Sequence, residues 1–269
     1  MRAQGKKFMV FAFLVLLGWP LSAGAATGNK FSVGIGLDYA TGDYGTDQTT
    51  DSWAVPFVVD YYPTKELDFE LVIPYIYQSN SNTIFANGMR YSMQQTSIRR
   101  RPSFNLDKSQ SGLGDMTLTM GYALLPETQT RPLVRPVLYL QFPTGDENKG
   151  LGTGEFAAGP GLGLSKWINN WNVFAEGRYI FQGSNSDIGL KDYGTLEGEV
   201  GYLVGSNFFP SFDLWYASAP ADDSSDLVVA KLKAKYRITD EWHAEGYLLT
   251  GLTNSTADFG LGASIFFNF

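Results

Sequence analysis

The chain has 269 residues, no cysteine and a formal net charge of −7, from 20 basic and 27 acidic side chains. The lack of cysteine excludes disulfides and thiolate metal sites, and the acidic balance argues against nucleic acid as a partner. Beyond the N-terminal region, no segment has eighteen apolar residues in a row, which excludes a helical membrane protein.

The N-terminal residues have the pattern of a secretory signal peptide. Three cations within the first seven residues precede an apolar run over 8–17, and the small residues 23–25 offer a cleavage site. We therefore expect a signal peptide over 1–25 and a single domain over 26–269. Without the three cations of the signal, the net charge changes from −7 to −10.

From residue 29 onward, apolar and polar side chains alternate in segments of strand length. A period of two places alternate side chains on opposite faces of a sheet. The connections between segments alternate between long and short, as in bacterial membrane barrels. The pattern predicts an all-β transmembrane antiparallel up-and-down β-barrel of about 12 strands, at 29–41, 51–62, 66–78, 112–125, 132–143, 154–165, 171–182, 193–204, 207–218, 226–238, 242–253 and 257–269.

The outward positions of these segments carry an aliphatic band between two groups of aromatic side chains. Tyr61 and Trp171 lie beside short connections, Trp53 and Phe181 lie beside long ones, and aliphatic residues such as Leu232 lie between. Two aromatic belts around an aliphatic band are typical of a barrel in a bilayer. The alternative is a soluble β-sandwich or lipocalin-type barrel, which would turn its apolar face inward.

The last segment, from Phe259 to Phe269, alternates throughout except at Phe266. Strands that end in a C-terminal Phe resemble the assembly signal of bacterial outer-membrane barrels. We therefore expect a Gram-negative outer-membrane location after export through the signal peptide. The expected partners are outer-membrane lipid, lipopolysaccharide and, through Phe269, the barrel-assembly machinery.

The opposite parity of the segments carries the charged side chains and is predicted to line the lumen. Its most distinctive part is a basic ladder, formed by Lys231, Lys233, Lys235 and Arg237 on one face of one strand. Four cations facing lipid would cost several kcal/mol near the midplane. The candidate constriction residues, which we expect at similar heights, are Lys231, Lys233, Lys235, Arg237, Glu197, Glu199, Asp213, Glu176 and Arg178.

Two interpretations of this charged face stay open. A salt-bridge network could fill a narrow barrel and hold it shut, or a constriction with a transverse field could select polar solutes. In a constriction, we expect the basic ladder to attract anions. Inward glycines such as Gly34 and Gly262 predict a bare wall where the first and last strands meet. Such a gap would be lumen, room for a folded-in loop, or relief of backbone strain.

The long polar segment near 79–111 is predicted to be an outer loop. A loop of this length is usually functional or mobile, so we expect it to constrict or cap the mouth of the barrel. Its cations Arg99, Arg100 and Arg101 would contact lumen carboxylates or lipopolysaccharide phosphates. The alternative is a flexible, solvated loop.

The sequence offers no catalytic or metal centre. The single histidine, His243, falls on the inward parity near a short connection, with no nucleophile pattern to accompany it. The pair Glu197 and Glu199 fits a lumen lining better than an acid–base pair. We therefore expect no enzyme activity, no metal and no cofactor.

Three short motifs in the middle of the chain resemble a known family. They are Gly-Leu-Gly-Asp at 112–115, Phe-Pro-Thr-Gly at 142–145 and Gly-Thr-Gly at 152–154, followed by a strand over 171–181. The chain resembles a family of outer-membrane proteins that are labelled either as transporters or as proteins of the meta-pathway of phenol degradation. The resemblance is clearest over 112–182. The resemblance implies a barrel found with aromatic-compound catabolism that admits hydrophobic or aromatic solutes.

Together these features predict an outer-membrane channel for passive diffusion of small molecules, with aromatic compounds or organic acids as the expected solutes. The alternative is a closed structural barrel whose loops bind lipopolysaccharide or a partner protein.

Overall fold

The computed structural model describes residues 30–46, 48–80, 83–86, 89–92, 108–185, 188–222 and 224–269. The predicted signal peptide, residues 1–25, lies outside these ranges.

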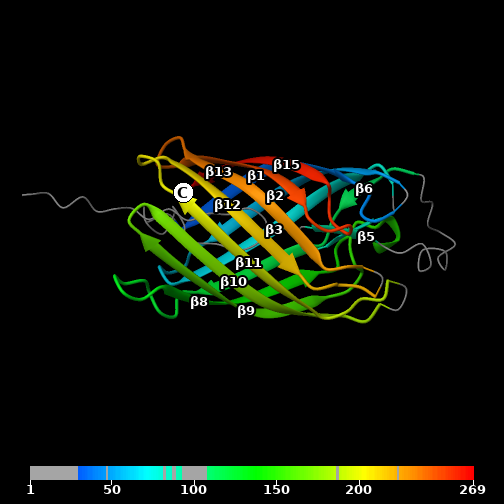
Figure 1. Cartoon of the computed structure of the whole chain (residues 1–269), viewed down its shortest axis with the longest axis horizontal. Coiled ribbons are helices and arrows are strands. Elements are labelled where there is room, and N and C mark those ends of the chain that lie inside the picture. Colours follow the sequence, from blue (N-terminus) through cyan, green and yellow to red (C-terminus); the bar gives the residue numbers. More distant parts are fainter. Residues whose placement is uncertain are drawn as a thin grey trace, which may run out of the picture.

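The described residues form a closed antiparallel barrel of twelve strands, shown in Figure 1, which confirms the predicted fold class. Each barrel strand pairs with its neighbours in the chain, and β1 pairs with β15 to close the sheet. One barrel strand consists of two pieces, β6 and β7, and β4 and β5 form a separate hairpin. The strands are β1 (Phe31–Gly42), β2 (Thr50–Tyr61), β3 (Leu67–Gln78), β4 (Thr83–Ala86), β5 (Met89–Ser92), β6 (Gln110–Leu113), β7 (Met116–Tyr122), β8 (Leu133–Phe142), β9 (Ala157–Ile168), β10 (Trp171–Gln182), β11 (Tyr193–Tyr202), β12 (Phe208–Ala217), β13 (Leu227–Arg237), β14 (Trp242–Gly251) and β15 (Phe259–Asn268).

The two ends of the barrel differ in the length of their connections. The turn end carries short connections such as 169–170 and 238–241, together with the C-terminus. The loop end carries long ones such as 143–156 and 79–109, the second of which contains the hairpin β4–β5 (Figure 1). In bacterial barrels the short turns face the periplasm.

The two faces of the wall have the predicted polarity. Leu232 is 61% exposed on the outside, whereas its neighbour Lys233 is 7% exposed on the inside. At the turn end, the rings of Phe31, Tyr61 and Phe269 stack side by side on the outer surface. An apolar outer face with interfacial aromatic rings is the surface that a bilayer covers. Among the described residues, no helix combines the length and the apolar character needed to cross a membrane.

The fourth barrel strand differs from the prediction of one strand over 112–125. It is interrupted at Gly114–Asp115, between β6 and β7, and only β7 pairs with β8. Pro74 of β3 lies opposite the interruption. Proline has no N–H to give to the ladder, and its carbonyl oxygen accepts the Gly114 N–H at 2.8 Å.

The predicted bare wall between the first and last strands is wrong, because large neighbouring side chains cover its glycines. Phe266 points inward, stacks on His243 with ring centroids 4.7 Å apart, and lies over Gly34. A Cβ at Gly34 would come within 2.3 Å of the Phe266 ring. Tyr247 covers Gly262 in the same way. These glycines therefore make room for packed side chains and leave no gap.

Candidate functional site: a lumen with two layers

The described lumen side chains form two layers along the barrel axis. On β12, Asp213 lies nearer the turn end and Trp215 nearer the loop end. On β13, Lys231 lies nearer the turn end and Val229 nearer the loop end. We call the charged set towards the turn end the ionic layer and the hydrophobic set towards the loop end the apolar layer.

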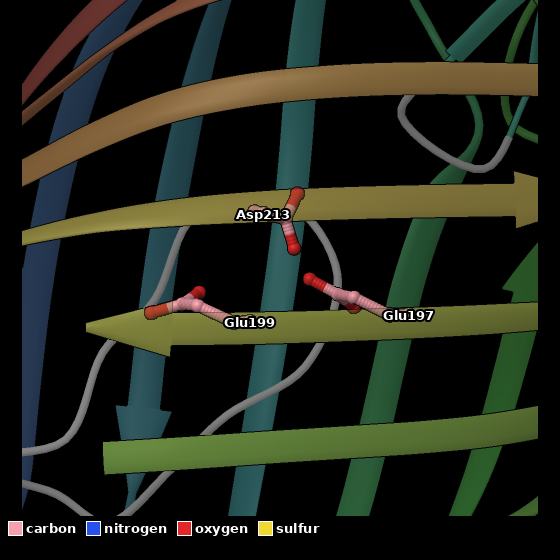
Figure 2. Close-up of side chains that lie close together, drawn as sticks. All are labelled: Glu197, Glu199 and Asp213. Carbon is pink, nitrogen blue, oxygen red and sulfur yellow. The ribbon is translucent and has the colours of Figure 1, made fainter. Parts of the chain in front are cut away.

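The strand register brings most of the predicted constriction residues to one height. Glu176 on β10 pairs with Glu197 on β11, and Glu199 pairs with Asp213, which pairs with Lys231. Figure 2 shows the three carboxylates Glu197, Glu199 and Asp213 gathered on β11 and β12. The structure thus assembles one continuous charged patch from β10 to β13.

Three lysines of the basic ladder each meet a carboxylate. Lys231 Nζ lies 3.6 Å from an Asp213 oxygen, and Lys235 Nζ lies 3.0 Å from a Glu245 oxygen. Lys233 donates a hydrogen bond to the Glu199 carboxylate. All three ammonium groups are therefore neutralised within the wall of the barrel.

Two arginines extend the ionic layer. Arg135 makes a two-pronged contact with Asp68, at 3.2 and 2.5 Å, and approaches Glu176 to 3.6 Å. Arg178 donates to Glu176 at 2.5 Å. Arg135 was not among the predicted constriction residues. The sequence signal was its inward parity in the predicted strand over 132–143, and a Cβ at Gly121 would come within 1.9 Å of its guanidinium.

The fourth member of the basic ladder lies outside the constriction, which corrects the prediction for Arg237. Its guanidinium lies at the turn end, where it donates to the Ser206 carbonyl oxygen at 2.8 Å. It also approaches the exposed Asp240 to 3.7 Å. Arg237 follows the inward parity, but its position as the last residue of β13 lets it reach out to the turns.

The buried charges of the described lumen are predominantly acidic. Ten carboxylates are buried: Asp38, Asp60, Asp68, Glu70, Asp115, Glu176, Glu197, Glu199, Asp213 and Glu245. Five cations are buried: Arg135, Arg178, Lys231, Lys233 and Lys235. Each cation has an acidic partner, whereas five of the carboxylates make no ion pair with a described residue: Asp38, Asp60, Glu70, Asp115 and Glu197. The expected attraction of anions by the ladder stays a prediction, and the acidic surplus opposes it.

Among the described residues, the three carboxylates of Figure 2 are spaced closely enough to ligate one metal ion, since their nearest oxygens lie within 4.8 Å of one another. Oxygen ligands of this kind suit hard divalent cations. Here Lys231 and Lys233 pair with Asp213 and Glu199, so two ammonium groups already supply the positive charge that a metal ion would bring. The arrangement fits an ion-pair network better than a metal centre.

The apolar layer is partly built by a connection that folds into the barrel. Ile84 of β4 is fully buried and belongs to one cluster with Tyr139, Ile180, Trp215 and Val229 from the barrel wall. The segment near 79–111 therefore places a side chain in the mouth, as predicted for a capping loop. The predicted contacts of Arg99, Arg100 and Arg101 lie outside the described residues and stay predictions.

A second connection, 143–156, also enters the mouth, and sequence reasoning missed it. Its Leu151 is fully buried against Ile76 of β3. The three family-like motifs were the sequence signal for this docked connection. The structure brings them, at 112–115, 142–145 and 152–154, into contact with one another.

Solved structures with a similar fold include outer-membrane channels and porins. An outer membrane channel from Pseudomonas putida F1 is 15% identical, with a TM-score of 0.64 and coverage of 100% of both chains. The NanC porin is 10% identical, with a TM-score of 0.57 and coverage of 88% of this chain and 100% of that one. The KdgM porin is 10% identical, with a TM-score of 0.53 and coverage of 88% and 99%. At these identities the likeness establishes the fold alone.

No curated protein sequence matches this chain. A family model described as "Putative MetA-pathway of phenol degradation" matches residues 66–269, which is most of the chain. Because that family is one of outer-membrane barrels, the match confirms the prediction that the chain is not an enzyme. The chain belongs to this family of outer-membrane barrels, the one that the motifs at 112–115, 142–145 and 152–154 resemble.

Proposed function

We propose that the protein is a passive outer-membrane channel for small molecules. The observation that carries this proposal is the surplus of buried carboxylates in the ionic layer. Burying a carboxylate without a cationic partner costs several kcal/mol. Hydrogen bonds offset part of this cost at Asp38 and Asp115. However, a barrel with a purely structural role gains nothing from Asp60, Glu70 and Glu197, which make no ion pair with a described residue. Water and cations that enter the lumen would remove this cost, as they do in a conducting pore.

The way in which the mouth is filled supports the same proposal. Ile84 and Leu151 lie in the lumen, but both belong to connections between barrel strands. A connection can move while the hydrogen-bonded wall stays intact, because the connection is not part of the ladder that joins the barrel strands. Passage would then require displacement of these two side chains and leave the barrel itself unchanged.

The two layers indicate the class of solute. Tyr139 and Trp215 give the apolar layer aromatic surface on which a ring can pack. The acidic surplus of the ionic layer disfavours anions, since like charges repel in a low-dielectric site. We therefore propose neutral or cationic aromatic compounds as solutes, ahead of organic acids. The description of the family, which refers to phenol degradation, is consistent with this choice.

We further propose that lipid and lipopolysaccharide surround the barrel and that the barrel-assembly machinery recognises Phe269. Phe269 is 55% exposed and stacks on Phe31 with ring centroids 5.6 Å apart. Phe269→Ala should reduce the amount of folded protein in the outer membrane, as measured by the heat-dependent shift in gel mobility. An unchanged amount would contradict this role.

A swelling assay with liposomes tests the channel and its solute class together. Benzyltrimethylammonium, phenyl glucoside and benzoate share one ring and differ in charge, and arabinose serves as a small solute without a ring. We expect the cationic and neutral aromatic solutes to enter faster than benzoate. Faster entry of benzoate would contradict the solute class, and no swelling with any solute would contradict the channel.

The second candidate is a closed structural barrel whose loops bind lipopolysaccharide or a partner. The packing of the lumen favours it, because the ion-paired side chains of the ionic layer are less than a tenth exposed. This candidate predicts neither conductance nor swelling from a folded barrel. The same assay therefore separates the two functions.

A further inference from the structure

We propose that Asp115 is a positioning residue that holds the segment 143–156 in the mouth of the barrel and thereby narrows the conduit. The inference rests on the proposed channel function. The proposal explains why the strand is interrupted between β6 and β7. Asp115 lies in that interruption and faces inward, with 2% exposure.

The carboxylate of Asp115 binds both ends of the segment. Its Oδ1 accepts the Gly145 N–H at 2.9 Å, and its Oδ2 accepts the Thr153 N–H at 2.8 Å. The Thr153 hydroxyl and the Gln141 side-chain amide also donate to Oδ2, at 3.1 and 2.9 Å. One side chain in the wall therefore satisfies backbone groups on either side of the turn that carries Leu151.

Thr144 adds a second tie at the same place. Its hydroxyl donates to the Gly114 carbonyl oxygen at 2.8 Å and accepts the Met116 N–H at 2.9 Å. The Gly114 carbonyl lies in the interruption and the Met116 N–H at its edge, and both bond to the Thr144 hydroxyl. A continuous strand would use these groups in β-pairing, so the interruption is what allows the segment to dock.

The docked segment fits tightly because glycines line the contact. A Cβ at Gly152 would lie 2.3 Å from Asp115 Oδ1, and a Cβ at Gly145 would lie 2.4 Å from the Leu151 carbonyl oxygen. A larger residue at either position would have to push the segment away from the wall. Gly152→Ala is thus a second way to disturb the same contact.

The docked segment also connects distant parts of the mouth. Gln78 at the end of β3 donates to the Lys149 carbonyl oxygen at 2.7 Å. On the other side, Asn185 in the connection after β10 donates to Glu147 at 3.0 Å and to the Thr153 carbonyl oxygen at 3.2 Å. The segment therefore extends from β3 to the connection after β10, and the conduit narrows where it passes.

The absence of cysteine in the chain allows a direct test of where the segment lies. Leu151→Cys places a single thiol at a fully buried position, and its rate of reaction with a water-soluble thiol reagent reports release of the segment. We compare it alone and combined with Asp115→Asn, which puts an amide donor against the donors of Gly145, Thr153 or Gln141. Asp240→Asn, at an exposed site on the turn end, is the matched control.

We expect Asp115→Asn to raise the labelling rate at least tenfold and to raise the conductance in planar bilayers, whereas Asp240→Asn changes neither. Gly152→Ala should have the same effect as Asp115→Asn. A cysteine pair at Ile76 and Leu151, joined by a short bifunctional reagent, should return the Asp115→Asn protein to the original conductance. The heat-dependent gel shift checks that each barrel is folded.

Unchanged labelling in both folded variants, Asp115→Asn and Gly152→Ala, would overturn the proposal. Raised labelling with unchanged conductance in a conducting protein would also overturn it, because the segment would then not narrow the conduit. Absence of conductance from every variant would instead refute the channel function, and labelling alone would then show whether Asp115 holds the segment.

Discussion

Lys233 on β13 donates a hydrogen bond to Glu199 on β11, reaching across the intervening strand β12. Both side chains are less than a tenth exposed. A complete buried pair contributes little net stability, because the loss of hydration offsets the attraction between the charges. Removing only one member of such a pair destabilises the folded protein, since the remaining charge is then buried without a partner.

Glu199→Gln should therefore lower the free energy of unfolding by about 3–5 kcal/mol. Adding Lys233→Met should restore most of this loss, because the unpaired ammonium group is removed. Urea unfolding in lipid vesicles, followed by tryptophan fluorescence, measures the cycle. The exposed pair Lys191 and Asp222 is the control, and its loss should cost less than about 1 kcal/mol. Additive effects of the two buried substitutions would contradict the pairing.

Glu197→Gln should weaken the preference of the channel for cations. Glu197 is buried beside Asp213 and makes no ion pair with a described residue, so its charge adds to the negative field of the ionic layer. The reversal potential in a KCl gradient measures the change, with the exposed Glu241→Gln as control. Acidification should weaken the preference in the same direction, because it protonates the surplus carboxylates. An unchanged reversal potential in both experiments would exclude the ionic layer as the selective element.

Gly34→Ala should destabilise the barrel by about 1–3 kcal/mol, because its methyl group collides with the ring of Phe266 and overpacks the closure between β1 and β15. Phe266→Leu in the same protein should relieve most of the effect. Gly177→Ala is the control, since its nearest neighbour would lie at 3.7 Å. The unfolding midpoint in urea reports each change. Equal loss for the two glycines would show that packing against Phe266 is not the cause.

Ile84→Ser should raise the conductance of the protein, because it places a hydroxyl group in the apolar cluster around Trp215 and weakens the packing of the inserted β4 strand. Leu232→Ser, on the outer face of β13, is a control of similar chemistry that should leave conductance unchanged. The prediction fails if both variants conduct like the original protein.

The sequence predicted the wall of the barrel better than its interior. Period-two alternation determines which face of each strand meets lipid, and it correctly separated Leu232 from Lys233. Alternation carries no information on hydrogen bonds between distant segments. It therefore missed the interruption at Asp115 and the buried position of Leu151, both of which depend on contacts with 143–156.

The sequence predicted the place of the ionic layer and most of its charged residues. Both the basic ladder and its acidic neighbours on other strands were expected at similar heights, but which cation meets which carboxylate depends on the register. Arg237 shows the same limit, because a residue at the end of a strand can follow the inward parity and still bind outside the lumen.

The conductance of the purified protein in a planar bilayer with a KCl gradient tests the central claim most directly. The account predicts discrete conductance steps with a reversal potential that favours cations. A folded barrel that inserts without any conductance would contradict the channel, and a reversal potential that favours anions would contradict the role of the acidic surplus in the ionic layer.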